Sequence, residues 1–235
     1  MRPSWVVTGV LAVIGAFLFT LQISWLLRFE PEWLPYPVHI VGAMLAGGAM
    51  AQAAPTQKLR EPLAAGMIAV LVLAAITWLL PRAFTLTAAR IDQRWLVTPV
   101  ITVASGLACA TGAWLFGRNA PPRVVGIVAV AAMVGACAIL LGGRLGLSLG
   151  VPASFVPSTI EIAVLGFLAG VAVQRVVDRE AVIAIGVGVA IFVGFGIVAL
   201  SMKGTPVGGA AAVATLVPIV TAALGARVTP KPRSS

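Results

Sequence analysis

Apolar residues fill long stretches of this chain, and short segments richer in polar residues separate them. In most stretches hydrophobic side chains would surround a helix on every side, without the polar face of a helix that lies against water. Each stretch approaches the roughly 20 residues that a helix needs to cross the hydrocarbon core of a bilayer. The pattern predicts about eight transmembrane helices, over residues 5–27, 36–54, 62–81, 95–116, 122–143, 159–177, 181–201 and 206–226.

Four prolines mark where the second helix of each apolar hairpin begins. Proline has no N–H to donate, so it is tolerated in the first turn of a helix and disruptive in its interior. Four hairpins account for eight helices, and we expect an all-α integral membrane protein. The four proline sites are Tyr36-Pro37-Val38, Thr98-Pro99-Val100, Val156-Pro157-Ser158 and Thr205-Pro206-Val207.

The composition also indicates a membrane protein. Of the 235 residues, 60% are hydrophobic and only 10% are charged, whereas about 25% of the residues in soluble domains are charged. We expect one multipass transmembrane domain over residues 1–227 and a short, basic cytoplasmic tail over 228–235. The bacterial inner membrane is the expected location.

The basic residues predict the orientation of the helices. Cytoplasmic loops of membrane proteins are enriched in Lys and Arg. With a cytoplasmic N-terminus, ten of the sixteen basic residues fall inside and six outside, which favours cytoplasmic positions for both termini. The net charge of +9 is spread singly over short loops. We interpret it as a topology signal and as contact with anionic headgroups, and we expect no nucleic-acid partner.

Small residues are concentrated in the second, fourth, sixth and eighth predicted helices. Examples are Gly47 in the second, Gly112 in the fourth and Gly170 in the sixth. Small side chains allow two helix backbones to approach closely in lipid. The pattern predicts an inner layer made of the even-numbered helices and an outer layer made of the odd-numbered ones.

Three polar residues are candidates for binding a substrate or an ion. Glu161 follows Pro157 in the sixth predicted helix, and carboxylates inside a membrane often mark ion or proton paths. The alternative for Glu161 is a helix cap with Ser158 in the first turn. His39 is a candidate proton site or, alternatively, a polar residue at the membrane interface. Gln22 would bind solute or hold two helices together.

The sequence favours no catalytic chemistry. Its single His and its two Cys, Cys109 and Cys137, do not form a set of metal ligands, and no phosphate-binding glycine loop is present. We expect neither an enzyme nor a metal or cofactor site. Both cysteines fall in apolar stretches, where a thiol acts as a small hydrophobic group.

One segment resembles a known family. Val156-Pro157-Ser158-Thr159, followed by Gly166, Leu168, Val173 and Arg175, is similar to a turn-and-helix segment of the oligopeptide transporter family. That family is built from repeated helix hairpins but has about twice as many spans. Its Gly-Leu-x-x-Gly-Glu segment has no Glu counterpart here, where Ile185-Gly186-Val187-Gly188 stands. The resemblance implies a half-size transporter unit that dimerises.

These features lead to two functional hypotheses. The first is a small integral membrane transporter or permease subunit that moves a small solute, and the second is a non-catalytic accessory or scaffold subunit of a larger membrane complex. The expected partners are the lipid bilayer and either further copies of the chain or other membrane subunits. The Gly- and Pro-rich segment 144–158 would be a re-entrant loop or a loop on the surface.

Overall fold

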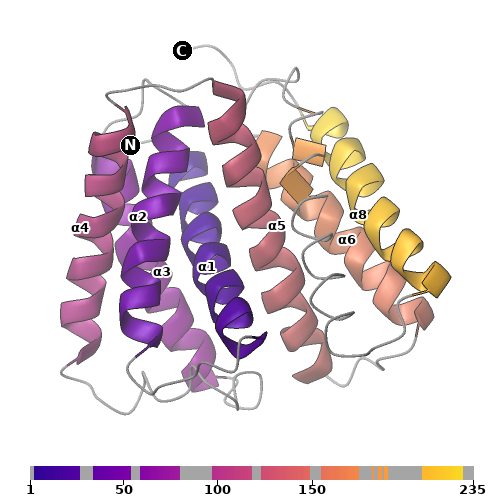
Figure 1. The fold of residues 1–235 in the computed structure, drawn as a ribbon, viewed down its shortest axis with the longest axis horizontal. Coiled ribbons are helices and arrows are strands. Elements are labelled where there is room, and N and C mark those ends of the chain that lie inside the picture. Colours follow the sequence, from indigo (N-terminus) through magenta and orange to yellow (C-terminus); the bar gives the residue numbers. More distant parts are fainter. Residues whose placement is uncertain are drawn as a thin grey trace.

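The protein is a bundle of long helices (Figure 1). The computed structural model describes residues 3–26, 34–53, 59–79, 97–117, 123–148, 155–174, 182, 185–186, 188–189 and 208–229. Regular secondary structure among these residues is entirely helical. The helices are α1 (Pro3–Leu26), α2 (Pro35–Ala53), α3 (Arg60–Leu79), α4 (Val97–Gly117), α5 (Arg123–Ser148), α6 (Phe155–Gln174) and α8 (Gly208–Val228).

These helices lie close to seven of the eight predicted ranges. The remaining range, 181–201, is described only at five helical residues, Val182, Ile185, Gly186, Gly188 and Val189, and otherwise lies outside the described residues. By length and composition alone, two segments of the described helices qualify as membrane spans, Pro3–Leu21 and Pro99–Gly117. The all-helical fold is therefore established, whereas the count of eight membrane spans stays a prediction.

Three of the four marked prolines lie in the first turn of a helix, as predicted. Pro37, Pro99 and Pro157 are each the third residue of α2, α4 and α6, respectively. The first N–H groups of a helix have no partner within it, so proline removes no hydrogen bond there. Pro206 lies outside the described residues.

The structure changes one predicted boundary. The segment 144–158, predicted to be a loop, is helical at both ends, because α5 continues to Ser148 and α6 already begins at Phe155. Proline is tolerated in the first turn of a helix, so α6 can begin before Pro157. Helix α8 ends at Val228, within one residue of the predicted start of the tail, and the Thr229 hydroxyl donates to the carbonyl oxygen of Gly225 at 2.7 Å. The division into a transmembrane domain and a tail stays a prediction.

The helix pair α2–α4 packs through two glycines that touch the opposite backbone. A Cβ atom at Gly47 would collide with the carbonyl oxygen of Cys109, and one at Gly112 would collide with that of Met44. Each contacted carbonyl lies three residues before the glycine of its own helix. The absence of side chains at both glycines therefore allows the two backbones to meet directly.

The pair α6–α8 repeats this geometry. A Cβ atom at Gly170 would collide with the carbonyl oxygen of Ala222, and one at Gly225 would collide with that of Phe167. Again each carbonyl lies three residues before the glycine of its own helix. Leu45-Ala46-Gly47 in α2 also matches Leu168-Ala169-Gly170 in α6. Helix α6 therefore takes the place of α2, and α8 takes that of α4.

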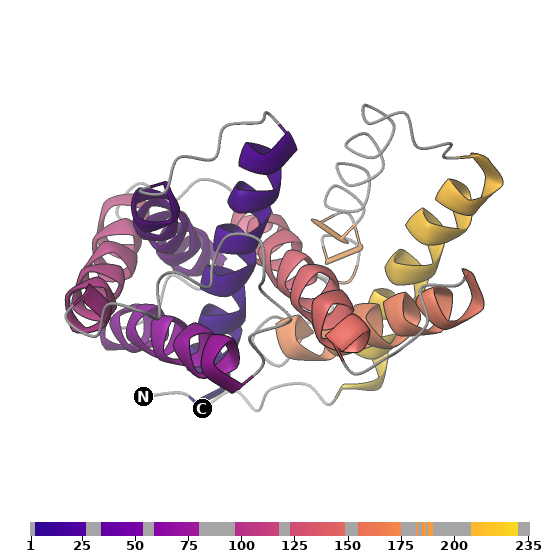
Figure 2. The ribbon, with the colours of Figure 1, turned by 90° about the horizontal axis from the view of Figure 1, so that it is seen from below.

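The described helices accordingly form two similar units. The first unit contains α1 to α4, and the second contains α5, α6, the helical residues between 182 and 189, and α8. Figure 2 shows the two units side by side, with α1 of the first unit and α5 of the second where they meet. Contacts of α1 with α5 and of α2 with α5 join the units.

The centre of the bundle is α1, which contradicts the predicted inner layer of even-numbered helices. Within Pro3–Leu21, 72% of an 18-residue stretch is buried, against 39% of such a stretch within Pro99–Gly117 of α4. The largest fully buried side chains include Phe17 and Ile14 of α1. Small residues do pair α2 with α4 and α6 with α8, but close pairing of two helices does not require that both lie at the centre.

The outward faces of the described helices are strongly apolar. On α8 the exposed large side chains recur every four residues, at Leu216, Val220, Leu224 and Val228. On α4 they are Val100, Val103, Leu107, Trp114, Leu115 and Phe116. Spacings of three and four residues place side chains on one face of a helix, so α8 presents an apolar stripe to its surroundings, and α4 presents a similar stripe that Thr111 interrupts.

Candidate functional site

A buried polar cluster joins three helices of the first unit. It consists of His39 on α2, Ser105 on α4 and the carbonyl group of Gly66 on α3, and we call it the polar node. His39 Nε2 lies 3.0 Å from Ser105 Oγ, and Ser105 Oγ lies 2.9 Å from the oxygen of Gly66. His39 is 3% exposed and Ser105 is fully buried. The node is therefore a polar site inside an otherwise apolar core.

The hydrogen bonds of the node determine the tautomer of His39. A serine hydroxyl carries one proton, and a carbonyl oxygen only accepts, so Ser105 donates to Gly66. Ser105 Oγ must then accept a hydrogen bond from His39 Nε2. Neutral His39 therefore carries its proton on Nε2, and Nδ1 is the ring nitrogen with an available lone pair.

Two features of the backbone place Ser105 within reach of Gly66. A Cβ atom at Gly66 would lie 2.5 Å from the carbonyl oxygen of Ser105, and one at Gly106 would lie 3.0 Å from that of Leu63. The glycines therefore bring α3 and α4 into backbone contact at the node.

Helix α1 contributes an aromatic contact. The ring of Phe17 meets the ring of His39 edge to face, with centroids 5.0 Å apart and planes at 77°. All four helices of the first unit thus meet at the polar node.

Among the described residues of the second unit, the positions equivalent to His39 and Ser105 carry no polar side chain. Ile162 lies eight residues before Gly170, as His39 lies eight residues before Gly47. Pro218 lies seven residues before Gly225, as Ser105 lies seven residues before Gly112. Apolar residues therefore occupy both positions in the second unit, and the polar chemistry is specific to the first.

The structure describes the surroundings of one of the three candidate residues, His39, but not the side chains of the other two. His39 is buried between helices, and its alternative interpretation as a polar residue at the depth of the membrane interface stays a prediction. Glu161 is the seventh residue of α6 and lies beyond the first turn, so its interpretation as a helix cap with Ser158 is wrong. The side chains of Glu161 and Gln22 lie outside the described residues. Their roles in binding a substrate or an ion remain predictions.

Three polar groups that matter in the structure were missed from the sequence. Ser105 resembled one more small residue in an Ala-Ser-Gly run. Thr8 donates to the carbonyl oxygen of Ala172 at 3.1 Å, which ties α1 to α6. Gln174 is fully buried at the end of α6, and neither atom of its amide has a hydrogen-bond partner in the part of the chain described. Thr8 and Gln174 are each a polar residue in an otherwise apolar stretch, and this pattern could have indicated a buried polar group.

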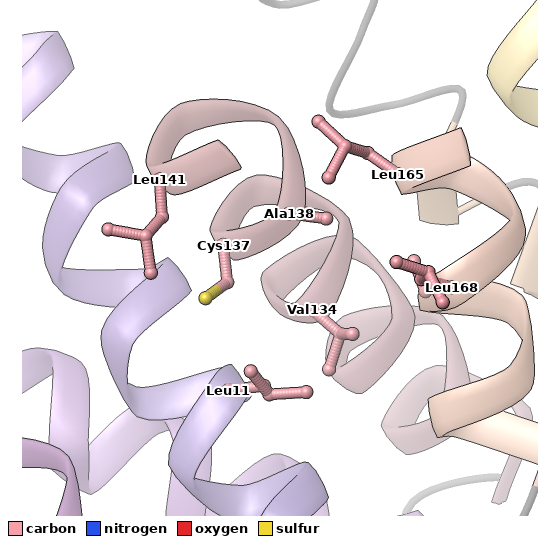
Figure 3. Close-up of a pocket in the computed structure, with 8 residues that line it drawn as sticks. Leu11, Val134, Cys137, Ala138, Leu141, Leu165 and Leu168 are labelled. Atoms are coloured by element: carbon pink, nitrogen blue, oxygen red, sulfur yellow. The ribbon is translucent and has the colours of Figure 1, made fainter. Parts of the chain in front are cut away.

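An apolar pocket of about 270 Å³ lies between α1, α5 and α6 (Figure 3). The described residues that line it are all hydrophobic, and among them only Cys137 has a side-chain heteroatom, its thiol sulfur. The lining residues are Leu11 of α1, Val134, Cys137, Ala138 and Leu141 of α5, and Leu165, Leu168 and Ala169 of α6. The pocket includes no residue of the polar node, so the two features are separate.

The cysteines behave as the sequence predicted. Cys109 and Cys137 are both buried, and neither forms a disulfide. Within the described ranges, no three His, Cys, Asp or Glu side chains gather where they could hold a metal ion. At the polar node, an imidazole, a hydroxyl and a backbone carbonyl form hydrogen bonds.

Comparison with protein-family profiles, curated proteins and solved structures found no match for this chain. The resemblance of residues 156–175 to the oligopeptide transporter family therefore stays a prediction.

Proposed function

We propose that this protein is a small integral membrane transporter or permease subunit that moves a small solute. The observation that carries the proposal is the buried polar node at the junction of α1 to α4. Ionisable residues inside membrane helices are energetically unfavourable and commonly mark binding sites or proton pathways. In this proposal His39 binds a polar group of the solute, or a coupled proton, and Ser105 orients its ring.

The surface of the described helices supports a membrane location. A soluble protein rarely exposes large contiguous apolar patches, whereas α4 and α8 expose apolar stripes along most of their length. A bilayer removes the unfavourable contact between these stripes and water. We propose a multipass protein of the bacterial inner membrane.

The charges at the helix ends support the proposed orientation. The contacts of Thr8 with Ala172, and of Gly170 with Ala222, place the start of α1 and the end of α8 at the same end of the bundle. The exposed residues Arg60, Arg123 and Arg227 lie at the start of α3, the start of α5 and the end of α8. Under the positive-inside rule this end is cytoplasmic.

The repeated architecture is also typical of transporters. Many transporter folds contain two similar helical units with a solute site at or near their interface. Here the two units differ in chemistry, because the node is polar and its counterpart in the second unit is apolar. The resemblance to the oligopeptide transporter family implies a dimer of the chain. It also makes peptides and amino acids the first solutes to test.

Uptake into proteoliposomes tests the proposal. The purified protein would be reconstituted and offered a panel of radiolabelled amino acids, dipeptides and tripeptides, with and without an inward proton gradient. We expect uptake of one class, reduced in His39→Ala, Ser105→Ala and Glu161→Gln. Thr111→Ala, at an exposed position on α4, should transport as the wild type does. Equal uptake by His39→Ala and the wild type would exclude His39 from the pathway.

A second candidate function is an accessory or scaffold subunit of a larger membrane complex. The apolar character of the pocket favours it, because a polar solute would find no hydrogen-bond partner there. Purification from native membranes in mild detergent separates the two functions. Stoichiometric partner subunits together with no uptake by the isolated chain would favour the accessory role.

A further inference from the structure

The pocket between α1, α5 and α6 occurs where the two units depart from their common geometry. Leu165 lies five residues before Gly170, as Gly42 lies five residues before Gly47, so Leu165 replaces a glycine. At Gly42 a Cβ atom would lie only 3.3 Å from the backbone nitrogen of Phe17, so α1 and α2 are in close contact. In the second unit the larger Leu165 lines the pocket instead.

A second replacement lies on α5. A Cβ atom at Gly9 would lie 2.7 Å from the Cβ of Ala65, and one at Gly188 would lie 2.9 Å from the Cβ of Ala131, so Ala131 takes the place of Gly9. Six residues further along, Cys137 takes the place of Gly15. Gly15 lets α1 touch the backbone of α5 at Met133, whereas Cys137 lines the pocket. In the first unit, glycines bring the helices into direct contact. At the equivalent positions of the second unit, the larger side chains of Leu165 and Cys137 line an open pocket.

The lining selects an apolar occupant. Figure 3 shows Leu165 and Leu168 of α6 facing Val134 and Ala138 of α5, with Leu11 of α1 across from Cys137. A polar solute would lose its hydrogen bonds to water here without replacement. The volume of about 270 Å³ exceeds the roughly 150 Å³ of an apolar cavity known to admit benzene. A flexible hydrocarbon segment satisfies both the chemistry and the size.

The pocket is continuous with the outer face of α6. Leu168 lines the pocket and is also 53% exposed, and Val164 and Ile160 extend the same exposed face at 51% and 60%. An occupant can therefore arrive sideways from the surroundings of the bundle. In a membrane those surroundings are hydrocarbon chains at very high local concentration.

We infer that this pocket binds one acyl chain of a bilayer phospholipid. The inference relies on the membrane location proposed above but not on transport. A bound chain fills the gap that Leu165 and Cys137 leave between α1, α5 and α6, and it restores the packing that the glycines provide in the first unit. The lipid then acts as a structural part of the contact between the two units.

Photo-labelling of the wild-type protein tests the inference. The full chain would be reconstituted in phosphatidylcholine vesicles that contain some lipid with a diazirine at the middle of one acyl chain, then irradiated, digested and analysed by mass spectrometry. We expect label at Cys137 or Ala169, although they are only 2% and 3% exposed. Ala46, the buried counterpart of Ala169, should remain unlabelled. Labelling of Cys137 and Ala169 no greater than that of Ala46 would overturn the inference.

A matched pair of variants separates a bound chain from bulk lipid. Leu168 and its counterpart Leu45 are similarly exposed, at 53% and 49%. Leu168→Trp should block the pocket and abolish the label at Cys137, while Leu45→Trp should leave it unchanged. Undiminished label at Cys137 in a folded Leu168→Trp protein would show that lipid reaches this thiol by another route. Should Leu168→Trp fail to fold, the wild-type comparison with Ala46 decides. Absence of label at Cys137 and Ala169 in a wild-type protein that transports would sink only the lipid site. Absence of uptake by a wild-type protein that is labelled there would sink only transport.

Discussion

Ser105 Oγ accepts a hydrogen bond from His39 Nε2 across 3.0 Å and joins α4 to α2 where both side chains are buried. Because Ser105 also donates to the carbonyl oxygen of Gly66, one hydroxyl connects three helices. Because the Ser105 hydroxyl takes part in both hydrogen bonds, replacing Ser105 removes both of them and weakens the node.

Replacing Ser105 by alanine should destabilise the protein. The substitution leaves the Nε2–H of His39 buried without an acceptor, which costs about 1–2 kcal/mol. Denaturant unfolding in detergent, followed by tryptophan fluorescence, measures the change, with Thr111→Ala as the exposed control on the same helix.

A double-mutant cycle of Ser105→Ala with His39→Ala tests whether the two side chains interact. The stability losses of the two single variants should add to more than the loss of the double variant. Strict additivity would show that the two side chains do not interact.

Adding a methyl group at the glycines of the two helix pairs should separate the helices. Gly47→Ala and Gly170→Ala each place a Cβ against a backbone carbonyl oxygen, that of Cys109 or that of Ala222. Overpacking of this kind costs about 1–3 kcal/mol. The same unfolding assay measures both variants, and their losses should be similar because the two contacts are equivalent.

Gly135→Ala is the matched control for these glycines. Gly135 is also buried within a helix, but a Cβ there would make an ordinary contact of 3.5 Å with a methyl group of Val189. We expect no loss, and a gain of up to about 1 kcal/mol from the higher helix propensity of alanine. Equal destabilisation by Gly135→Ala and Gly47→Ala would contradict the backbone-contact explanation.

Removing the hydroxyl of Thr8 should weaken the contact between the units. Thr8→Val preserves the shape of the side chain and deletes its hydrogen bond to Ala172 of α6, at a cost of about 0.5–1.5 kcal/mol. Thr20→Val is the control, because Thr20 donates to Ala16 of its own helix. Thermal unfolding should show a lower midpoint for Thr8→Val than for Thr20→Val. The reverse order would argue against Thr8 as a tie between α1 and α6.

Single cysteines at the helix ends should report one cytoplasmic face. In a background with Cys109→Ala and Cys137→Ala, we expect Arg60→Cys, Arg123→Cys and Arg227→Cys to react with a membrane-impermeant maleimide only after cells are permeabilised. Trp78→Cys, near the other end of α3 and 72% exposed in the wild type, should react in intact cells. Labelling of Arg60→Cys and Arg227→Cys from opposite sides would rule out the proposed orientation.

Much of the helical architecture follows from local properties of the sequence. Long apolar runs satisfy their backbone hydrogen bonds within a helix, and Pro37, Pro99 and Pro157 are at the position where proline is best tolerated, its first turn. The seven described helices therefore lie near their predicted ranges. Small residues also identified α2, α4, α6 and α8 as closely packed helices, because glycine is the residue that allows backbone contact.

Tertiary packing decided what these local rules leave open. His39 and Ser105 are 66 residues apart in the chain, and nothing in the Ala-Ser-Gly run around Ser105 distinguishes a buried hydrogen-bonding partner from a small spacer. The central position of α1 likewise depends on how all the helix faces fit together, since α1 and the more exposed α4 are both predominantly apolar. The sequence by itself thus determined where helices form, through backbone hydrogen bonding and the absence of charge. Only the tertiary structure decided which helices touch, because that choice depends on complementary shapes from distant segments.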